Sequence, residues 1–114
     1  MDVWTSQGIV TVSVAGTPVR ATNNQSSPPS RFAAHSIFFQ QVASNTGKIY
    51  ICDSATANKS TGVGVLAVLA APTSSFIPSA SGTVTYAPNA FNLAEYWIDA
   101  DVGGEGCLVS SIRA

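Results

Sequence analysis

Charged side chains are scarce in this 114-residue chain. Asp, Glu, Lys and Arg make up 10% of it and the net charge is −1, whereas an average globular domain is about 25% charged. The chain lacks the clustered Lys and Arg that nucleic-acid binding needs, so we expect no nucleic-acid partner. A surface made largely of Ser, Thr, Asn, Gly and Ala is typical of an extracellular β-protein or of a protein that buries part of itself against partners. We favour the second.

Long apolar runs are also missing. The longest, residues 63–71, contains a glycine and stops at Pro72, far short of the roughly 18 residues that a spanning helix needs, so we expect no membrane partner. Residues 1–4 lack the basic start and apolar core of a secretory signal. Without export, the two cysteines, Cys52 and Cys107, are expected to be reduced and half-buried in strands.

Groups for metal binding and catalysis are few. His35 is the single histidine, which excludes a multi-histidine metal site within one chain. Asp99, Asp101 and Glu105 resemble a calcium loop only loosely, because the EF-hand spacing is absent. We expect these acids to accept backbone amides in a turn instead. No Gly-x-Ser-x-Gly nucleophile motif occurs. The sequence therefore predicts no cofactor, no metal site and no enzymatic activity.

Apolar residues alternate with small or polar ones through most of the chain, which is the period of a half-buried strand. The pattern predicts an all-β, single-domain β-sandwich or small jelly-roll-like barrel of seven to eight short antiparallel strands. We expect residues 1–7 to form an N-terminal arm and residues 8–114 a single β-domain. A short helix over 63–71 remains an alternative, and 89–95 is expected to form a helical turn. The expected strands are 8–15, 17–22, 32–43, 47–52, 63–71, 82–87, 96–100 and 106–112.

Two polar turns suggest hairpins. Ser44, Asn45, Thr46 and Gly47 tolerate the dihedral angles of a tight reversal, so we expect strands 32–43 and 47–52 to pair. By the same reasoning, 101–105 joins strands 96–100 and 106–112 in a last hairpin.

Some aromatic residues occupy positions that one core cannot accommodate. Neighbours on a strand point to opposite faces, so one member of each adjacent aromatic pair should leave the core. The tryptophan at position 4 lies in the expected arm. An intersubunit contact is the commoner fate of such residues, although a carbohydrate platform of Tyr96, Trp97 and Asp99 is an alternative. The candidate protein-interface residues are Trp4, Phe38, Phe39, Tyr96 and Trp97.

Three segments resemble small virion structural proteins of tailed bacteriophages, of the capsid decoration or cement type and the related head-fibre bases. They are Thr-Pro-Val-Arg-Ala-Thr at 17–22, residues 36–51 around Ser-Asn-Thr-Gly-Lys-Ile-Tyr-Ile, and Tyr-Trp-Ile-Asp-Ala-Asp-Val-Gly-Gly-Glu-Gly at 96–106. In order and spacing these segments are similar to the family pattern, and the match spans most of the chain from about residue 17 onward.

This resemblance implies a non-enzymatic protein that binds and stabilises the capsid shell. Its partners would be the major capsid protein and copies of itself in a homotrimer. Its location would be the capsid surface of the virion, after synthesis in the host cytoplasm. The alternative function is that of a carbohydrate-binding β-sandwich module of a tail or fibre protein.

Overall fold

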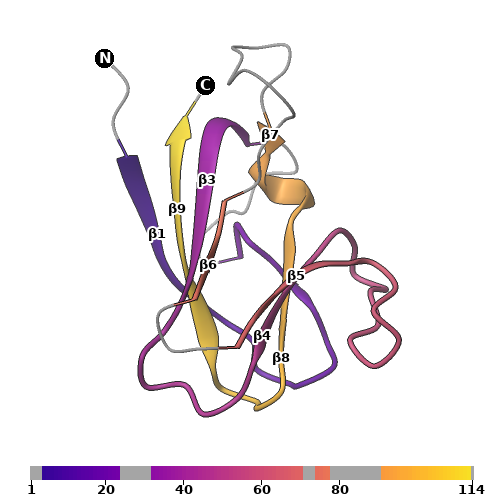
Figure 1. Ribbon diagram of the computed structural model, residues 1–114. Helices are drawn as coiled ribbons and strands as arrows, with labels where there is room; N and C mark the ends of the chain where they lie inside the picture. Colours follow the sequence, from indigo (N-terminus) through magenta and orange to yellow (C-terminus); the bar gives the residue numbers. More distant parts are fainter. Residues whose placement is uncertain (1–3, 24–31, 71–73, 78–90, 114) are drawn as a thin grey trace.

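The computed structural model describes residues 4–23, 32–70, 74–77 and 91–113, and in these residues the chain is all-β (Figure 1). The expected fold class is confirmed. Nine strands and one 3-10 turn are present in the described part, slightly more strands than the seven to eight expected. The elements are β1 (Trp4–Thr11), β2 (Val19–Arg20), β3 (Ala33–Gln41), β4 (Ile49–Cys52), β5 (Val65–Leu69), β6 (Ser75–Phe76), β7 (Phe91–Asn92), η1 (Leu93–Glu95), β8 (Trp97–Ala100) and β9 (Gly106–Arg113).

The strands form two antiparallel sheets that enclose one core, as in a small β-sandwich. The five-stranded sheet has the order β1-β9-β3-β6, with β7 also paired to β3, and the four-stranded sheet has the order β2-β8-β4-β5. Both sheets contribute fully buried side chains to a single hydrophobic cluster. Burial of this apolar surface is the main force that holds the sheets together. The largest aliphatic members include Ile37 and Val109 from one sheet and Ile49, Ile51 and Ile98 from the other.

Several local expectations are confirmed. Residues 65–69 form strand β5 and not a helix, in keeping with the glycines before them and the proline after them. The expected helical turn is η1, in which the Asn92 side chain accepts a hydrogen bond from the backbone N–H of Ala94. Such a cap satisfies an amide that has no partner within the turn. The expected strand 82–87 lies outside the described residues.

Both expected hairpins are wrong. Strand β3 pairs with β9, β6 and β7, whereas β4 pairs with β5 and β8, so the connection 42–48 crosses between the sheets. The connection 101–105 crosses back in the same way. A polar, glycine-containing segment suits a crossing arch as well as a tight turn. The crossing at 42–48 is supported by Gln41, whose side-chain amide donates to the carbonyls of Leu69 and Gly47 at 2.9 and 3.2 Å.

The expected N-terminal arm also needs correction, because strand β1 begins at Trp4 and not at Gly8. Trp4 is paired with Ile112 of β9, and the register shifts between Ser6 and Gly8. Gly8 has φ of 74° at this bulge, a conformation that favours glycine. The extra residue at the bulge reverses which sheet face each side chain points to. The in-and-out pattern of side chains in residues 4–6 therefore does not continue the pattern that follows Gly8. Residues 1–3 lie outside the described part.

Candidate functional site

The outward face of the five-stranded sheet carries the candidate interaction surface. On β9, Cys107, Val109 and Ser111 are buried, whereas Ser110 and Ile112 between and beyond them are only partly buried. Residues paired in register project to the same side of a sheet. Phe38 is paired with Ser110, and Trp4 is paired with Ile112. Both aromatic side chains therefore lie on the face that is turned away from the core.

Trp4 and Phe38 make an edge contact with ring centroids 6.5 Å apart and ring planes at 79°. With Ile77 and Ser110 they line a hollow of about 410 Å³, and we call these four residues the Trp4 patch. Trp4 is 50% exposed and Ile77 is 52% exposed. Two large apolar side chains that remain half in water beside a hollow are the kind of surface that partners bury.

Phe39 does not belong to this surface, which corrects its place among the interface candidates. It is fully buried and stacks on Phe76 with ring centroids 6.2 Å apart. Its ring also lies 5.6 Å from that of Tyr96, across the core. The expectation that one residue of the adjacent pair leaves the core is confirmed, with Phe38 outside and Phe39 inside.

Tyr96 and Trp97 also lie on different faces. Tyr96 packs against the core and meets Phe91 with ring centroids 6.5 Å apart. Trp97 is covered by Arg20, whose guanidinium carbon lies 4.8 Å from the indole centroid and whose Nη1 donates to the Ala94 carbonyl at 2.7 Å. A cation over an indole ring is a favourable contact. Neither side chain is part of the Trp4 patch.

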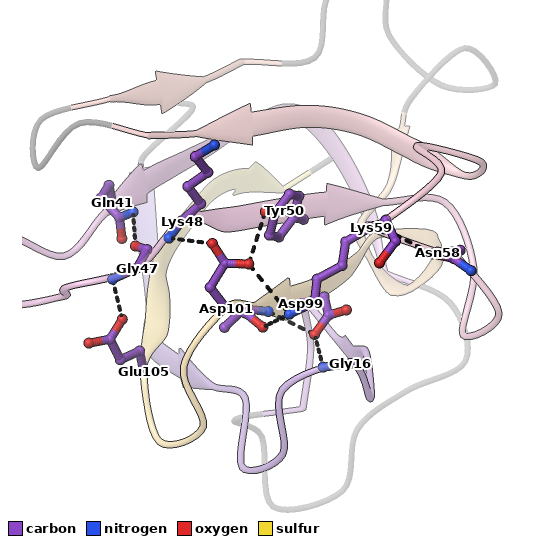
Figure 2. Close-up of polar contacts among 12 residues, drawn as sticks. Gly16, Gln41, Gly47, Lys48, Tyr50, Asn58, Lys59, Asp99, Asp101 and Glu105 are labelled. Atoms are coloured by element: carbon purple, nitrogen blue, oxygen red, sulfur yellow. Dashed lines mark hydrogen bonds and ion pairs between the residues drawn. The ribbon is translucent and has the colours of Figure 1, made fainter.

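Asp99, the third member of the alternative carbohydrate platform, is buried. Its Oδ1 accepts hydrogen bonds from the backbone N–H groups of Gly16 at 2.9 Å and Ala100 at 2.8 Å, as Figure 2 shows for Gly16. Buried Asp99 cannot flank an exposed aromatic ring. Tyr96, Trp97 and Asp99 therefore do not form one platform.

The acids of the 101–105 connection support the fold by binding the opposite loop. Glu105 accepts from the backbone N–H groups of Thr46 at 2.7 Å and Gly47 at 3.0 Å. Asp101 accepts from the Tyr50 hydroxyl at 2.9 Å and forms an ion pair with Lys59 at 3.4 Å (Figure 2). These acids accept backbone amides, as expected, but the amides belong to the other crossing and not to the turn in which the acids lie.

These contacts shift the acidity of both carboxyl groups. Burial acts to raise the pKa of Asp101, but hydrogen bonds from Tyr50, the Lys48 backbone and Lys59 outweigh it, so the pKa lies below its ordinary value. The backbone amides of Thr46 and Gly47 lower the pKa of Glu105. Both acids are thus held in the charged form, which accepts these hydrogen bonds.

Both cysteines are free, as expected, but they are fully buried and not half-buried. Burial, with smaller contributions from Asp99 and Asp53, raises the pKa of Cys52 to about 11. Burial raises the pKa of Cys107 to about 12. The thiols are therefore protonated at neutral pH, and the thiolate that reacts as a nucleophile is almost absent. Among the described residues, no group of three or more His, Cys, Asp or Glu side chains could hold a metal ion.

Sequence reasoning missed two of the four residues of the Trp4 patch. Ser110 could have been found, because the alternation of 106–112 places it on the face opposite Val109. Ile77 could not, because it follows a strand of only two residues and no periodic pattern assigns it to a face. His35 lies on β3, and its side chain is not described.

Comparisons of the chain with protein-family models, with curated proteins and with solved structures find no match. Within the described residues, no helix has the length and apolar character to cross a membrane.

Proposed function

We propose that this chain is a non-enzymatic structural protein of a tailed-phage virion that binds the capsid shell and stabilises it. The observation that carries the proposal is the Trp4 patch, an apolar hollow on an outward sheet face. The resemblance of the segments 17–22, 36–51 and 96–106 to decoration and cement proteins directs the proposal to the capsid. The all-β fold suits a role that needs a rigid body and no catalytic group.

The patch has the chemistry of an interface centre. Aromatic side chains are enriched at the centres of protein interfaces, where they fill hollows and exclude water. Covering Trp4 and Ile77 would remove apolar surface from water, which contributes about 25 cal/mol for each Å². Low overall charge limits the desolvation cost of bringing two such surfaces together.

The partners in this proposal are the major capsid protein and two further copies of the chain. One patch of four residues gives a weak contact on its own. Three linked copies at a threefold or quasi-threefold position would engage the shell together, and repeated weak contacts then add by multivalency. The proposal places the protein on the capsid surface after synthesis in the host cytoplasm. The free thiols of Cys52 and Cys107 suit that reducing compartment.

Carbohydrate binding was the other hypothesis from the sequence. It needs an exposed aromatic platform with polar neighbours. Trp97 lies under Arg20 and Asp99 is buried, so the residues expected to provide the platform do not favour that function.

Binding to capsids tests the proposal. Purified chain is mixed with capsids of its own phage that lack it, and the bound fraction is measured by co-sedimentation. We expect saturable binding that Trp4→Ala weakens at least tenfold. Val63→Ala is the matched control, because Val63 is 71% exposed and lies outside the patch. Cryo-electron microscopy of the decorated capsid would then show three copies around each occupied axis.

Two results would contradict the proposal. If the wild-type chain does not bind the capsids, the proposed function is wrong. If wild type and Trp4→Ala bind equally well, the Trp4 patch is not the contact surface. Circular dichroism of each variant shows whether the fold is kept, so that a loss of binding is assigned to the patch and not to unfolding.

A further inference from the structure

A second hollow, of about 360 Å³, is lined by the residue that follows β4, by β5, and by the segment 91–96 that contains β7 and the turn η1. Figure 1 shows η1 at the start of β8, away from the 101–105 connection. Three separate segments of the chain supply the walls of the hollow, and the hollow shares no residue with the Trp4 patch. The lining residues are Asp53, Leu66, Phe91, Asn92, Glu95 and Tyr96.

One part of the wall is apolar. Leu66 projects from β5 and is 49% exposed. Phe91 and Tyr96 meet edge to face with ring planes at 67°, and Tyr96 is held from behind by Phe39. An alkyl chain could lie along these side chains with most of its surface out of water.

The rest of the wall is acidic. Asp53 and Glu95 are both exposed, and neither carboxylate has a hydrogen bond or ion pair in the described part of the chain. The nearby cation Arg20 is occupied by the Ala94 carbonyl and the Trp97 ring. The hollow therefore presents two negative charges that the described side chains do not offset.

Asn92 does not supply a further acceptor. Its side-chain oxygen already accepts from the backbone N–H groups of Phe32 at 2.8 Å and Ala94 at 3.1 Å. These two bonds fix the amide on the wall, with its nitrogen as the remaining polar group. The charged acceptors open to a ligand in this hollow are thus the carboxylates of Asp53 and Glu95.

We infer that this hollow binds the side chain of a lysine or arginine presented by a partner protein. The alkyl stem would lie against Leu66 and the aromatic rings, and the N–H groups would donate to Asp53 and Glu95. Hydrogen bonds between charged N–H donors and carboxylates are stronger than neutral ones, and an aromatic ring beside the cation adds to the attraction. This inference does not rest on the proposed function, because the hollow offers the same chemistry to any partner.

Other ligand classes fit less well. A quaternary ammonium has no N–H group to donate to the carboxylates, and its usual site is a cage of several aromatic rings. A neutral sugar can donate hydroxyl groups but leaves both negative charges without a counter-charge. The pairing of two carboxylates with an apolar wall favours a cation on an alkyl stem.

Titration with Nα-acetyl-lysine amide at low salt, followed by amide chemical shifts in NMR spectra, tests the inference. We expect saturable shifts centred on Leu66, Glu95 and Tyr96, and no comparable response to choline or N-acetylglucosamine. Removing both charges in D53N/E95Q should weaken binding at least tenfold. Leu66→Ala keeps both charges and should weaken it about threefold, since one apolar wall is lost.

The variant D101N/E105Q is the matched control, because it changes the net charge by the same amount at a different site. Equal weakening in this control would show a long-range charge effect and overturn the inference. Shifts centred elsewhere, or binding of choline as tight as that of the lysine probe, would overturn it as well. Preferential saturation by N-acetylglucosamine would assign the hollow to a sugar.

If D101N/E105Q does not fold, two single variants replace the double ones. Glu105→Gln removes one charge outside the hollow, and Glu95→Gln makes the same chemical change inside it. The titration also needs no capsid. A hollow that ignores the lysine probe while the chain still binds capsids through Trp4 would refute this inference and leave the proposed function standing.

Discussion

Phe39 and Tyr96 meet between the two sheets, with ring centroids 5.6 Å apart and ring planes at 47°. Phe39 comes from β3 in the five-stranded sheet, and Tyr96 directly precedes β8 in the four-stranded sheet. The neighbour of Phe39 in sequence, Phe38, points away from this contact and meets Trp4 on the outward face. Two adjacent phenylalanines thus serve the core and the surface separately.

This division predicts different costs for two identical substitutions. Phe39→Ala should lower the free energy of unfolding by about 3–5 kcal/mol, because it removes a fully buried ring and leaves a cavity. Phe38→Ala should cost about 1 kcal/mol or less, because its ring is only partly buried. Urea unfolding of the two variants beside the wild type measures both values. Similar losses in the two would show that the faces of β3 are wrongly assigned.

Much of the fold could be predicted from the sequence, because side chains alternate along a strand. Strands β3 and β5 lie within expected runs, and β9 extends one residue past its expected run. Strand pairing could not be predicted in the same way. A Ser-Asn-Thr-Gly segment is compatible with a tight turn and with an arch between sheets. The choice depends on long-range contacts such as the bonds from Gln41 to Leu69, which no local pattern contains.

The candidate site was only partly predictable. The adjacent phenylalanines show that one of them must point away from the core. The pairing of β3 with β9 decides which one, and it places Phe38 on the outward face. Trp4 was expected to find its partner in another subunit, yet it already contacts Phe38. The bulge at Gly8 hides this from a reading of the alternation. The second hollow, which is lined by Asp53 and Glu95, brings together residues from distant segments of the chain. No spacing in the sequence therefore indicates this hollow.

Stability in acid should depend on the two carboxylates that bind the 42–48 connection. The folded-state pKa values of Asp101 and Glu105 are lowered from ordinary values of about 3.9 and 4.3. A lowered pKa contributes stability that is fully present above the ordinary value and is lost as the pH falls through the folded value. The variant D101N/E105Q should be less stable than wild type above about pH 5 and should lose less stability toward about pH 2.5.

Urea unfolding at a series of pH values measures this dependence. The variant D53N/E95Q is the control, because its carboxylates make no hydrogen bonds among the described residues. It should keep the acid dependence of the wild type. If D101N/E105Q loses stability as steeply as the wild type does, the two acids do not couple the crossing loops in the way we describe.

The cysteines should resist alkylation in the folded protein. The pKa of Cys52 is raised from 9.0 to about 11, so the thiolate fraction near neutral pH falls about a hundredfold, as two pKa units require. Cys107, with a pKa of about 12, should react more slowly still. Iodoacetamide labelling at pH 8 with and without urea, read by intact mass, measures both rates. Rapid labelling of the native chain, or a mass two hydrogens below the reduced form, would contradict the buried free thiols.

Gly106 should be unable to accept a side chain without a backbone shift, because it lies against the backbone of β1. A Cβ there would be 2.4 Å from the carbonyl oxygen of Val10 and 3.0 Å from Cα of Thr11. These are backbone atoms in a paired strand, so relief requires that β1 move away from β9. Gly106→Ala should therefore lower the free energy of unfolding by about 3 kcal/mol or more.

Gly104 provides the matched comparison for this steric argument. Its φ is +91° and a Cβ there would meet nothing within 4 Å, so Gly104→Ala tests backbone strain without a clash and should cost about 1–2 kcal/mol. Thermal and urea unfolding of both variants separate the two effects. Trp4 lies on β1, and the pairing of β1 with β9 fixes its position. Gly106→Ala should therefore weaken capsid binding as well, whereas Gly104→Ala should not. Equal costs for the two alanines would show that β1 is not held closely against β9 at this point.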